Sequence, residues 1–220
     1  MTAALEISGL SLDDHDGLPL VRDLTLTLNP GERIVVGGPV ETTSGLLRAV
    51  MGLEVAGAGT VRLLGQELAV LSRAEAEALL ERIGYSPRIG ALVSNLPLRD
   101  NLLLPLRYHR RLPATDVPAA ALRAAARFGL ATLPVAIPPV VSVLVRRRVA
   151  LARATVLDPV LLVVDDPTED LDPAAADEIA DRLAAAAGEL NATVLAASND
   201  FRVAAALRAR TLLLTPPVQS

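Results

Sequence analysis

The sequence predicts an α/β protein with a parallel core sheet flanked by helices, an antiparallel β subdomain at one side and an inserted helical subdomain. The first 30 residues alternate apolar and polar side chains, as strands do when one face is buried. Further along, short apolar runs each precede or follow a stretch with helical spacing, which is typical of parallel βαβ units. A stretch punctuated by prolines, from about 87 to 139, interrupts this alternation and indicates the helical insertion.

Antiparallel strands are expected in the first 65 residues. The turn between the first two is expected over 13–17, and a further edge strand over 61–64. The apolar positions that alternate along the first two strands are Leu5, Ile7, Leu10, Val21, Leu24, Leu26 and Leu28. This spacing gives each strand one buried face.

Three apolar runs predict buried strands of the parallel core, a fourth strand is expected where the helix from Ser72 ends, and helical spacing predicts the helices between them. The strands are expected over 33–37, 83–85, 160–164 and 193–197. The helices are expected over 46–53, 72–82, 119–128, 146–156 and 173–187, the second with Ser72 as N-cap and Glu75 at the third position. A last short strand and a polar tail are expected over 207–217. The prediction is therefore one domain, 1–220, whose core (1–86 and 146–220) carries a helical subdomain over 87–145.

Composition excludes several classes of protein. With 220 residues, 51% of them apolar, the chain can bury a sizeable core. A net charge of −4 and the lack of basic clusters interleaved with aromatics leave no electrostatic footprint for nucleic acid, so no nucleic-acid partner is expected. No cysteine is present, which fits a reducing compartment. The start of the chain does not read as an export signal and no apolar run is long enough to span a membrane, so a cytoplasmic location is expected.

Lysine is absent from the whole sequence, and all 21 basic residues are arginine. A composition bias towards Ala, Arg, Leu and Val accounts for this without any functional cause. The absence nevertheless removes the ammonium group from any chemistry that this chain could perform.

Two stretches carry a resemblance to a known family. The run from Arg148 to Pro173, RVALARATVLDPVLLVVDDPTEDLDP, and the run from Leu46 to Glu54, LLRAVMGLE, closely resemble ABC-type ATPases, the ATP-binding subunits of ABC transporters. The first is similar to the family's helix, Walker B strand and D-loop, and the second to the helix after its phosphate loop. The resemblance covers nearly the whole chain, from Leu5 to about Leu214. It implies a P-loop-NTPase-like core with ATP and Mg²⁺ as the family's cofactors.

The phosphate loop corresponds to GGPVETTSG over 37–45. In such loops, glycines let backbone N–H groups surround the phosphates, a lysine reaches the outer phosphates and a Ser or Thr holds Mg²⁺. Gly37 and Ser44 match that pattern, whereas Thr43 stands where the lysine belongs and Gly45 follows the serine. The nucleotide-binding candidates are therefore Gly37, Thr43, Ser44 and Gly45, with Ser44 as a candidate Mg²⁺ ligand. Residual phosphate binding and a vestigial turn are both compatible with this loop.

The remaining loop positions also depart from the family pattern. Val40 and Thr42 replace glycines, and Glu41 places a negative charge beside a site that would receive a polyanion. The adenine-stacking aromatic is missing, because the corresponding turn offers only His15. These substitutions predict weakened nucleotide binding.

Four further positions carry the family's catalytic roles by resemblance. Asp165 keeps the Walker B carboxylate that would hold Mg²⁺, and Asp166 stands at the general base, one methylene shorter than the family's glutamate. Arg88 replaces the glutamine that senses Mg²⁺, although arginine cannot accept a hydrogen bond from a metal-bound water. Asn199 replaces the switch histidine and cannot take up a proton at neutral pH. Both carboxylates could alternatively be polar caps at a strand end.

The family's signature, Leu-Ser-Gly-Gly-Gln, appears here as VSVLV over 141–145. Only Ser142 survives, and branched side chains replace the glycines that let a helix N-terminus approach the partner's phosphate. In this family two subunits enclose two nucleotides, so both halves of a composite site are altered in this chain.

Three functions follow from the resemblance. The leading interpretation is a catalytically incompetent ABC subunit, requiring no cofactor, that acts as a structural or regulatory partner in a membrane transport complex. It would pair with itself or with another ABC ATP-binding subunit and dock on an integral-membrane subunit, lying on the inner face of the membrane. The stretch from Ile89 to Leu106 is similar to lipid-trafficking members that work with Mce-type proteins. The alternatives are a slow ATPase completed by a partner and a free-standing, nucleotide-independent adaptor.

Overall fold

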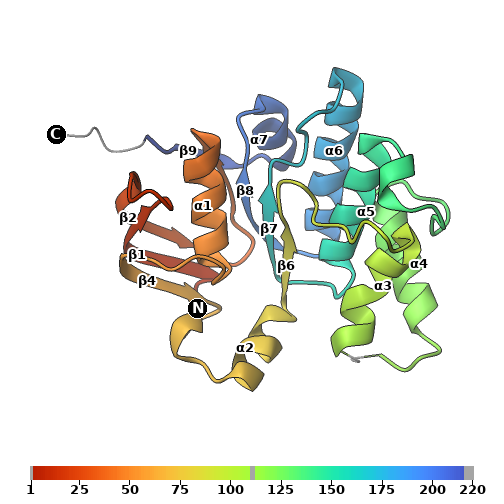
Figure 1. Ribbon diagram of the computed structural model, residues 1–220, viewed down its shortest axis with the longest axis horizontal. Coiled ribbons are helices and arrows are strands. Elements are labelled where there is room, and N and C mark those ends of the chain that lie inside the picture. Colours follow the sequence, from red (N-terminus) through yellow and green to blue (C-terminus); the bar gives the residue numbers. More distant parts are fainter. Residues whose placement is uncertain (1, 110–111, 216–220) are drawn as a thin grey trace.

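A computed structural model describes residues 2–109 and 112–215, and it contains an antiparallel sheet, a parallel sheet and helices on the parallel sheet's faces (Figure 1). The antiparallel sheet has the order β2-β1-β4-β5 and the parallel sheet the order β6-β7-β8-β3-β9. The strands of the first are β1 (Leu5–Asp13), β2 (Pro19–Leu28), β4 (Ala58–Leu63) and β5 (Gln66–Glu67). Those of the second are β3 (Arg33–Gly37), β6 (Ile83–Ser86), β7 (Leu161–Asp165), β8 (Thr193–Ala197) and β9 (Arg210–Leu213). The α/β fold class predicted from the sequence is confirmed.

Along the chain, helices lie between the successive strands of the parallel sheet. They are α1 (Val40–Val50), α2 (Arg73–Leu80), α3 (Leu98–His109), α4 (Val117–Arg127), α5 (Val143–Thr155), α6 (Pro173–Glu189) and α7 (Phe201–Leu207). Of these, α3, α4 and α5 follow one another between β6 and β7. Short 3-10 turns lie at Leu68–Val70 and Pro138–Val140. The insertion expected over 87–145 contains α3 and α4, which lie beside α5 at the right of Figure 1.

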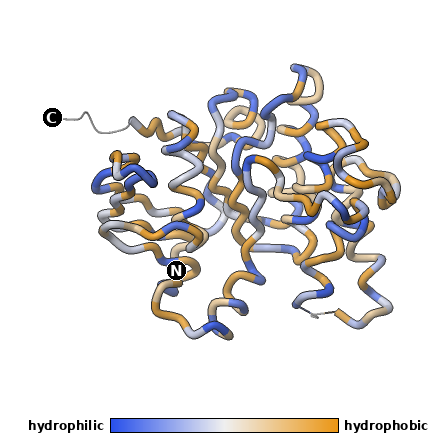
Figure 2. The backbone as a smooth tube through the Cα atoms, in the orientation of Figure 1, coloured by the Kyte–Doolittle hydropathy of each residue, from blue (hydrophilic) through white to orange (hydrophobic). Residues whose placement is uncertain are grey.

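The core lies on both faces of the parallel sheet. Alternate residues of β7 show why: Leu161 and Val163 pack with α1 and the antiparallel sheet, whereas Leu162 and Val164 pack with helices α3 to α7. All of them are buried, as expected for a parallel sheet covered on both faces. The core strands accordingly appear as a hydrophobic centre in Figure 2.

Most expected elements are present, with shifted ends. The helix at Ser72 has the predicted capping box, in which Ser72 and Glu75 bond each other's backbone N–H groups. The helix expected from 146 begins three residues earlier, and the one expected from 46 begins at Val40. The last strand covers 210–213, since 201–207 is helical, and the predicted tail beyond 215 lies outside the described residues.

Candidate nucleotide site

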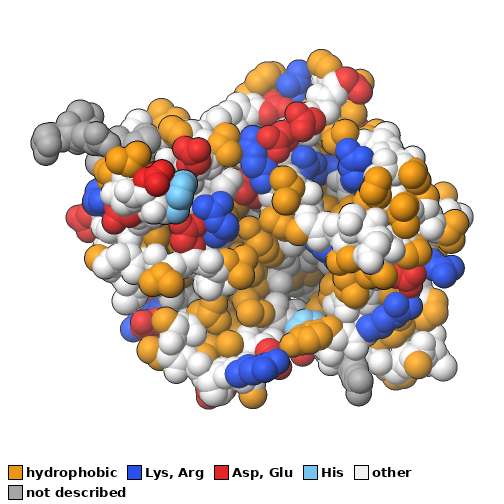
Figure 3. Space-filling model, viewed as in Figure 1, with side chains coloured by type: hydrophobic (Ala, Val, Ile, Leu, Met, Phe, Trp, Pro, Cys, Tyr) orange, Lys and Arg blue, Asp and Glu red, His pale blue; other side chains and the backbone are white. Residues whose placement is uncertain are grey.

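The candidate site residues gather at one edge of the parallel sheet, where the carboxyl ends of the core strands meet. β3 ends at Gly37, β7 at Asp165 and β8 at Ala197, and the strands pair in parallel. Loops that follow parallel strands lie at the same edge, which is where open α/β sheets bind ligands. Arginine and acidic side chains are interspersed on the surface above this edge (Figure 3).

The expected phosphate loop over 37–45 is largely helical, because α1 begins at Val40. The Thr43 N–H donates to the Pro39 carbonyl at 3.0 Å, which is a helical hydrogen bond. Its hydroxyl also lies within 3.3 Å of the Pro39 and Val40 carbonyl oxygens. The prediction of an open loop up to 45 is therefore wrong. The physical reason is that Val40 and Thr42 favour ordinary backbone angles, whereas a loop that curls around phosphates needs glycines.

Three of the predicted nucleotide-binding residues are consequently inside α1. Thr43 and Ser44 are 4% and 5% exposed, and Gly45 packs so closely on Leu20 that an added Cβ would lie 3.1 Å from that side chain. Glu41 lies in the first turn, where a negative charge is favourable at a helix N-terminus. The same negative charge disfavours a phosphate anion at this helix end.

Asn199 holds the residue that follows β3. Its Nδ2 donates to the Gly38 carbonyl and its Oδ1 accepts from the Gly38 N–H, both at 2.9 Å. Gly38 has φ of 141°, and a Cβ there would overlap the Leu214 carbonyl oxygen. Asn199, at the switch-histidine position, thus binds both backbone polar groups of Gly38, which lies in the segment that corresponds to the phosphate loop.

Ser44 and Asp165 come together below this loop and present oxygen atoms that lack partners. Asp165 is 3% exposed, and neither its Oδ1 nor the Ser44 Oγ makes a hydrogen bond; Thr42 Oγ1 is similarly buried and unpaired. Burial raises the pKa of the Asp165 carboxyl, and the nearby Ser44 hydroxyl and the Arg88 charge oppose that rise only in part. Carboxylate and hydroxyl oxygens are the donors that Mg²⁺ prefers, so these two residues fit the ion.

Asp166, the candidate general base, is already engaged by other side chains. Arg88 Nη1 lies 3.3 Å from its Oδ2, and the Ser198 hydroxyl donates to its Oδ1 at 3.2 Å. Burial raises the pKa of Asp166, and the Arg88 guanidinium partly offsets this. Arg88 also donates from Nε and Nη2 to Glu169 Oε1, at 2.9 and 2.6 Å. The residue at the glutamine position therefore pairs with two carboxylates.

Two arginines of α5 bind the backbone around Arg88. Arg147 donates to the Arg88 carbonyl at 2.5 Å and to the Glu169 carbonyl at 3.2 Å. Arg153 donates to the carbonyls of residues 90 and 91, at 2.6 and 2.8 Å. Burial lowers the pKa of both guanidinium groups, but arginine stays charged because its pKa is so high.

Ser142 caps α5. Its hydroxyl accepts from the Val145 N–H at 3.3 Å, and it has the extended backbone of an N-cap. This hydrogen bond gives the one surviving signature residue a structural role within the chain.

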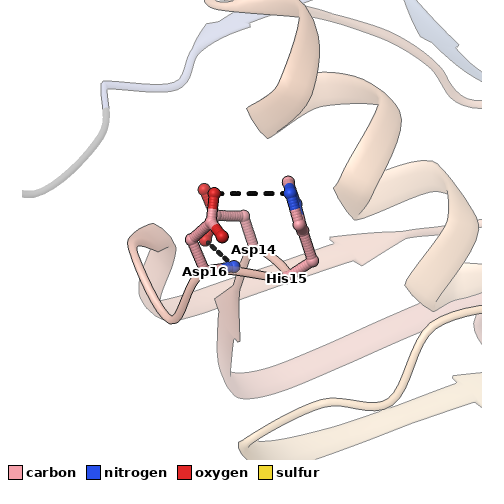
Figure 4. Close-up of side chains that lie close together, drawn as sticks. All are labelled: Asp14, His15 and Asp16. Atoms are coloured by element: carbon pink, nitrogen blue, oxygen red, sulfur yellow. Dashed lines mark hydrogen bonds and ion pairs between the residues drawn. The ribbon is translucent and has the colours of Figure 1, made fainter.

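His15 lies in an exposed turn between β1 and β2 (Figure 4). Its Nε2 is 3.3 Å from Asp16 Oδ2, and its side chain is 89% exposed. Asp14 accepts hydrogen bonds from the N–H groups of Asp16 and Leu18, as in an Asx turn. The three side chains lie close enough to share a metal ion, yet the turn geometry accounts for them without one.

The family model for ABC transporters, described as "ABC transporter", matches residues 21–169. The chain belongs to the ABC transporter family. Its relatives include the lipoprotein-releasing system ATP-binding protein LolD of Hydrogenovibrio crunogenus, 30% identical over 91% of this chain and 89% of that protein. The nickel import ATP-binding protein NikO of Rhodobacter capsulatus is 33% identical over 97% of this chain and 86% of that protein. The probable ribonucleotide transport ATP-binding protein mkl of Mycobacterium tuberculosis is 28% identical over 93% of this chain, which spans only 57% of its length.

Solved structures of the family have the same fold. A dimeric structure of the ATP-binding cassette MJ0796 bound to ADP and Pi superposes with a TM-score of 0.84, at 22% identity, over 96% of this chain and 94% of that one. CbiO1 from Clostridium perfringens is part of the ABC transporter complex cbiONQ. It superposes with a TM-score of 0.77, at 23% identity, over 91% of this chain and 80% of that one. No helix among residues 2–109 and 112–215 is long and apolar enough to cross a membrane.

The family positions on the core strands and α1 converge at the edge of the sheet, and Ser142 is engaged in the cap of α5. Sequence reasoning missed Glu169 and the two α5 arginines. The signal for Glu169 was available, since an arginine at the glutamine position needs an anionic partner and an acidic residue follows the Walker B strand closely. Arg147 and Arg153 bind only backbone carbonyls, which no sequence pattern marks.

Proposed function

We propose that this chain is an ABC-transporter subunit that supports a membrane transport complex without hydrolysing ATP. The observation that carries the proposal is the early start of α1 at Val40. A phosphate cradle needs backbone N–H groups that point at the ligand. Here the Thr43 N–H bonds Pro39 and the Gly38 N–H bonds Asn199, so groups that would contact phosphate are used within the protein.

The environment of Asp166, the candidate general base, supports the same proposal. A general base must reach the water it activates, at about 2.6–3.2 Å. Both oxygens of Asp166 face protein groups, Arg88 on one side and Ser198 on the other. No lysine is present to neutralise the outer phosphates, and an arginine stands where the family uses glutamine.

Ser44 and Asp165 favour one alternative, a slow ATPase completed by a partner subunit. Their unpaired oxygens would hold Mg²⁺, which in this family supplies positive charge to the phosphates of ATP. The rest of the site opposes this alternative, because the residues that would hold the triphosphate itself are inside a helix. The free-standing adaptor is the other alternative, and it predicts partner capture without a membrane subunit.

The comparisons support a role in a transport complex. LolD, NikO and mkl are all named as ATP-binding proteins of release, import or transport systems, MJ0796 is described as a dimer and cbiO1 as part of a complex. By analogy, we propose that this chain pairs with itself or with another ABC ATP-binding subunit. It would dock on an integral-membrane subunit through the helical subdomain over 87–145, on the cytoplasmic face of the membrane. The likeness to LolD and to lipid-trafficking members favours a lipid-linked cargo.

The test is calorimetric titration of the purified chain with ATP and Mg²⁺ up to millimolar nucleotide. We expect no saturable heat. The Thr43→Lys variant is the matched comparison, and it should also fail to bind, because restoring the ammonium does not reopen the helical turn. The proposal would be overturned in favour of the slow ATPase by either of two results. One is saturable ATP binding to the wild-type chain that is lost in Asp165→Ala, and the other is ATP hydrolysis that is lost in Asp166→Asn.

A further inference from the structure

The connection from β6 to α3, residues 87–97, is held by side chains along its length. Arg88 pairs with the loop after β7, Arg153 binds the carbonyls of 90–91, and Asn101 binds the segment 93–97. This connection carries the chain from the parallel sheet into α3 and α4. Its geometry therefore contributes directly to how those helices sit on the sheet.

The strongest of these contacts is the cluster of Arg88, Asp166 and Glu169. The three side chains are 23%, 16% and 27% exposed, so solvent and salt screen their charges only in part. A planar guanidinium group can form ion pairs with two carboxylates at once. A glutamine amide is neutral and cannot form an ion pair. An arginine here thus ties the loop after β6 to the loop after β7 by charge.

Arg147 joins the same two loops through their backbone. Its two terminal nitrogens donate to the carbonyls of Arg88 and Glu169, and its side chain extends from α5. The segment also contains Ala91 with φ of 43°, a conformation that alanine rarely adopts, and Arg153 bonds its carbonyl. A strained backbone persists only when surrounding contacts hold it.

At the end of the connection next to α3, Asn101 holds residues 93–97 in place. It is fully buried on α3, where its Oδ1 accepts from the Val93 N–H at 2.7 Å. Its Nδ2 lies 3.0 to 3.3 Å from three carbonyl oxygens of the segment 93–97. The connection is thus bonded to α3 as well as to α5 and the sheet.

We propose that the cluster of Arg88, Asp166 and Glu169 is an internal lock, which holds the connection 87–97, and with it α3 and α4, in one orientation on the sheet in the absence of nucleotide. The guanidinium provides positive charge between carboxylates where the family pattern has a neutral glutamine. The consequence for docking rests on the proposed function: a membrane subunit meets one constant surface of the helical subdomain, whatever nucleotide is present.

The experiment is amide hydrogen exchange on the full chain without nucleotide, comparing wild type with Arg88→Gln and Glu169→Gln. Losing hydrogen bonds to charged groups should speed exchange in 88–97 and 166–171 by about 10-fold to 150-fold. Peptides of α6 serve as the internal reference for global folding. Arg123→Gln is the matched control, since Arg123 is exposed on α4 and forms no ion pair with any described residue.

The double variant, Arg88→Gln with Glu169→Gln, separates a lock from general loosening. If the two side chains act as a pair, exchange in the double variant should match that of Arg88→Gln, which already removes both ion pairs, instead of multiplying the two single effects. Arg88→Lys, which keeps the charge but loses the planar fork, should fall between wild type and Arg88→Gln.

The lock would be overturned if residues 88–97 exchanged at the same rate in wild type, Arg88→Gln and Arg123→Gln. It would also be overturned if exchange in α6 rose as much as exchange in the two loops. Failure of the proposed function would look different, because it would appear as saturable ATP binding in calorimetry while the exchange pattern stayed as expected.

Discussion

Replacing Asp165 by asparagine should stabilise the protein. The aspartate is 3% exposed, its Oδ1 has no hydrogen-bond partner, and burial raises the pKa of the carboxyl. A buried polar atom without a partner costs about 1–3 kcal/mol, and charge adds to that cost. Asparagine has nearly the same shape without the charge, so we expect Asp165→Asn to raise the free energy of unfolding by about 1–2 kcal/mol. For a chain of this size that corresponds to roughly 2–8 °C in Tm.

The effect should depend on pH in a defined direction. A carboxyl whose pKa is raised by folding binds its proton more tightly in the folded state. Its stabilising contribution is therefore complete below the unfolded-state pKa and is lost as pH rises through the folded-state pKa. The advantage of Asp165→Asn over wild type should thus be greatest near neutral pH and should shrink as the pH falls towards 4. Comparing the two proteins at each pH cancels the contribution of Asp166, whose pKa burial also raises.

The assay is chemical unfolding followed by circular dichroism, at several pH values and with or without millimolar Mg²⁺. Asp181→Asn is the matched control, since Asp181 is exposed on α6 and should change stability by less than about 0.5 kcal/mol. A loss of stability in Asp165→Asn at neutral pH would refute the reasoning. The reasoning would also be refuted if Mg²⁺ raised the free energy of unfolding of the wild type but not that of the variant. Asp165 would then be a metal ligand in the isolated chain.

Two further substitutions test the packing around the site by the same unfolding assay. Gly38→Ala should cost more than about 3 kcal/mol, because Gly38 has φ of 141° and a Cβ there overlaps a backbone oxygen. Gly17→Ala, at φ of 78° with open space around it, should cost only about 1–2 kcal/mol, and equal losses at both positions would contradict the argument. Asn101→Leu should cost at least about 3 kcal/mol, because it leaves several backbone groups of 93–97 unpaired, whereas the exposed Asn95→Leu should be nearly neutral. A small effect at Asn101 would mean that water replaces its hydrogen bonds.

The fold could be predicted because its signals are local. Apolar runs such as 160–164 have the length and composition of buried strands, and Ser72 with Glu75 marks a helix start through a hydrogen-bond pattern within four residues. The family resemblance then supplied the register of the site. Asp165 and Asn199 could be placed together because one ends and the other follows a strand of the same parallel sheet.

The part of the site that escaped prediction depends on contacts between distant residues. A phosphate loop was expected over 37–45 because the family has one, while the actual residues lack the glycines that hold such a loop open. The 81-residue separation of Arg88 and Glu169 hides their pairing, and Arg147 reaches carbonyls that no side-chain pattern indicates. Expectation by resemblance thus failed where the residues themselves had changed.

The altered positions of the site are linked by charge. In the family pattern, lysine, Mg²⁺ and a neutral glutamine surround the phosphates, so the positive charge near the carboxylates arrives with the ligand. In this chain the lysine position is a threonine inside α1, and a permanent cation, Arg88, stands beside Asp166 and Glu169. Without it, two largely buried carboxylates would face each other, which is destabilising at neutral pH. An arginine at the glutamine position therefore neutralises Asp166 and Glu169 without a ligand, whereas the metal ion of a nucleotide would be held by other residues, Ser44 and Asp165. The helical start of α1 and the arginine cluster both support the proposed role in a transport complex without ATP hydrolysis.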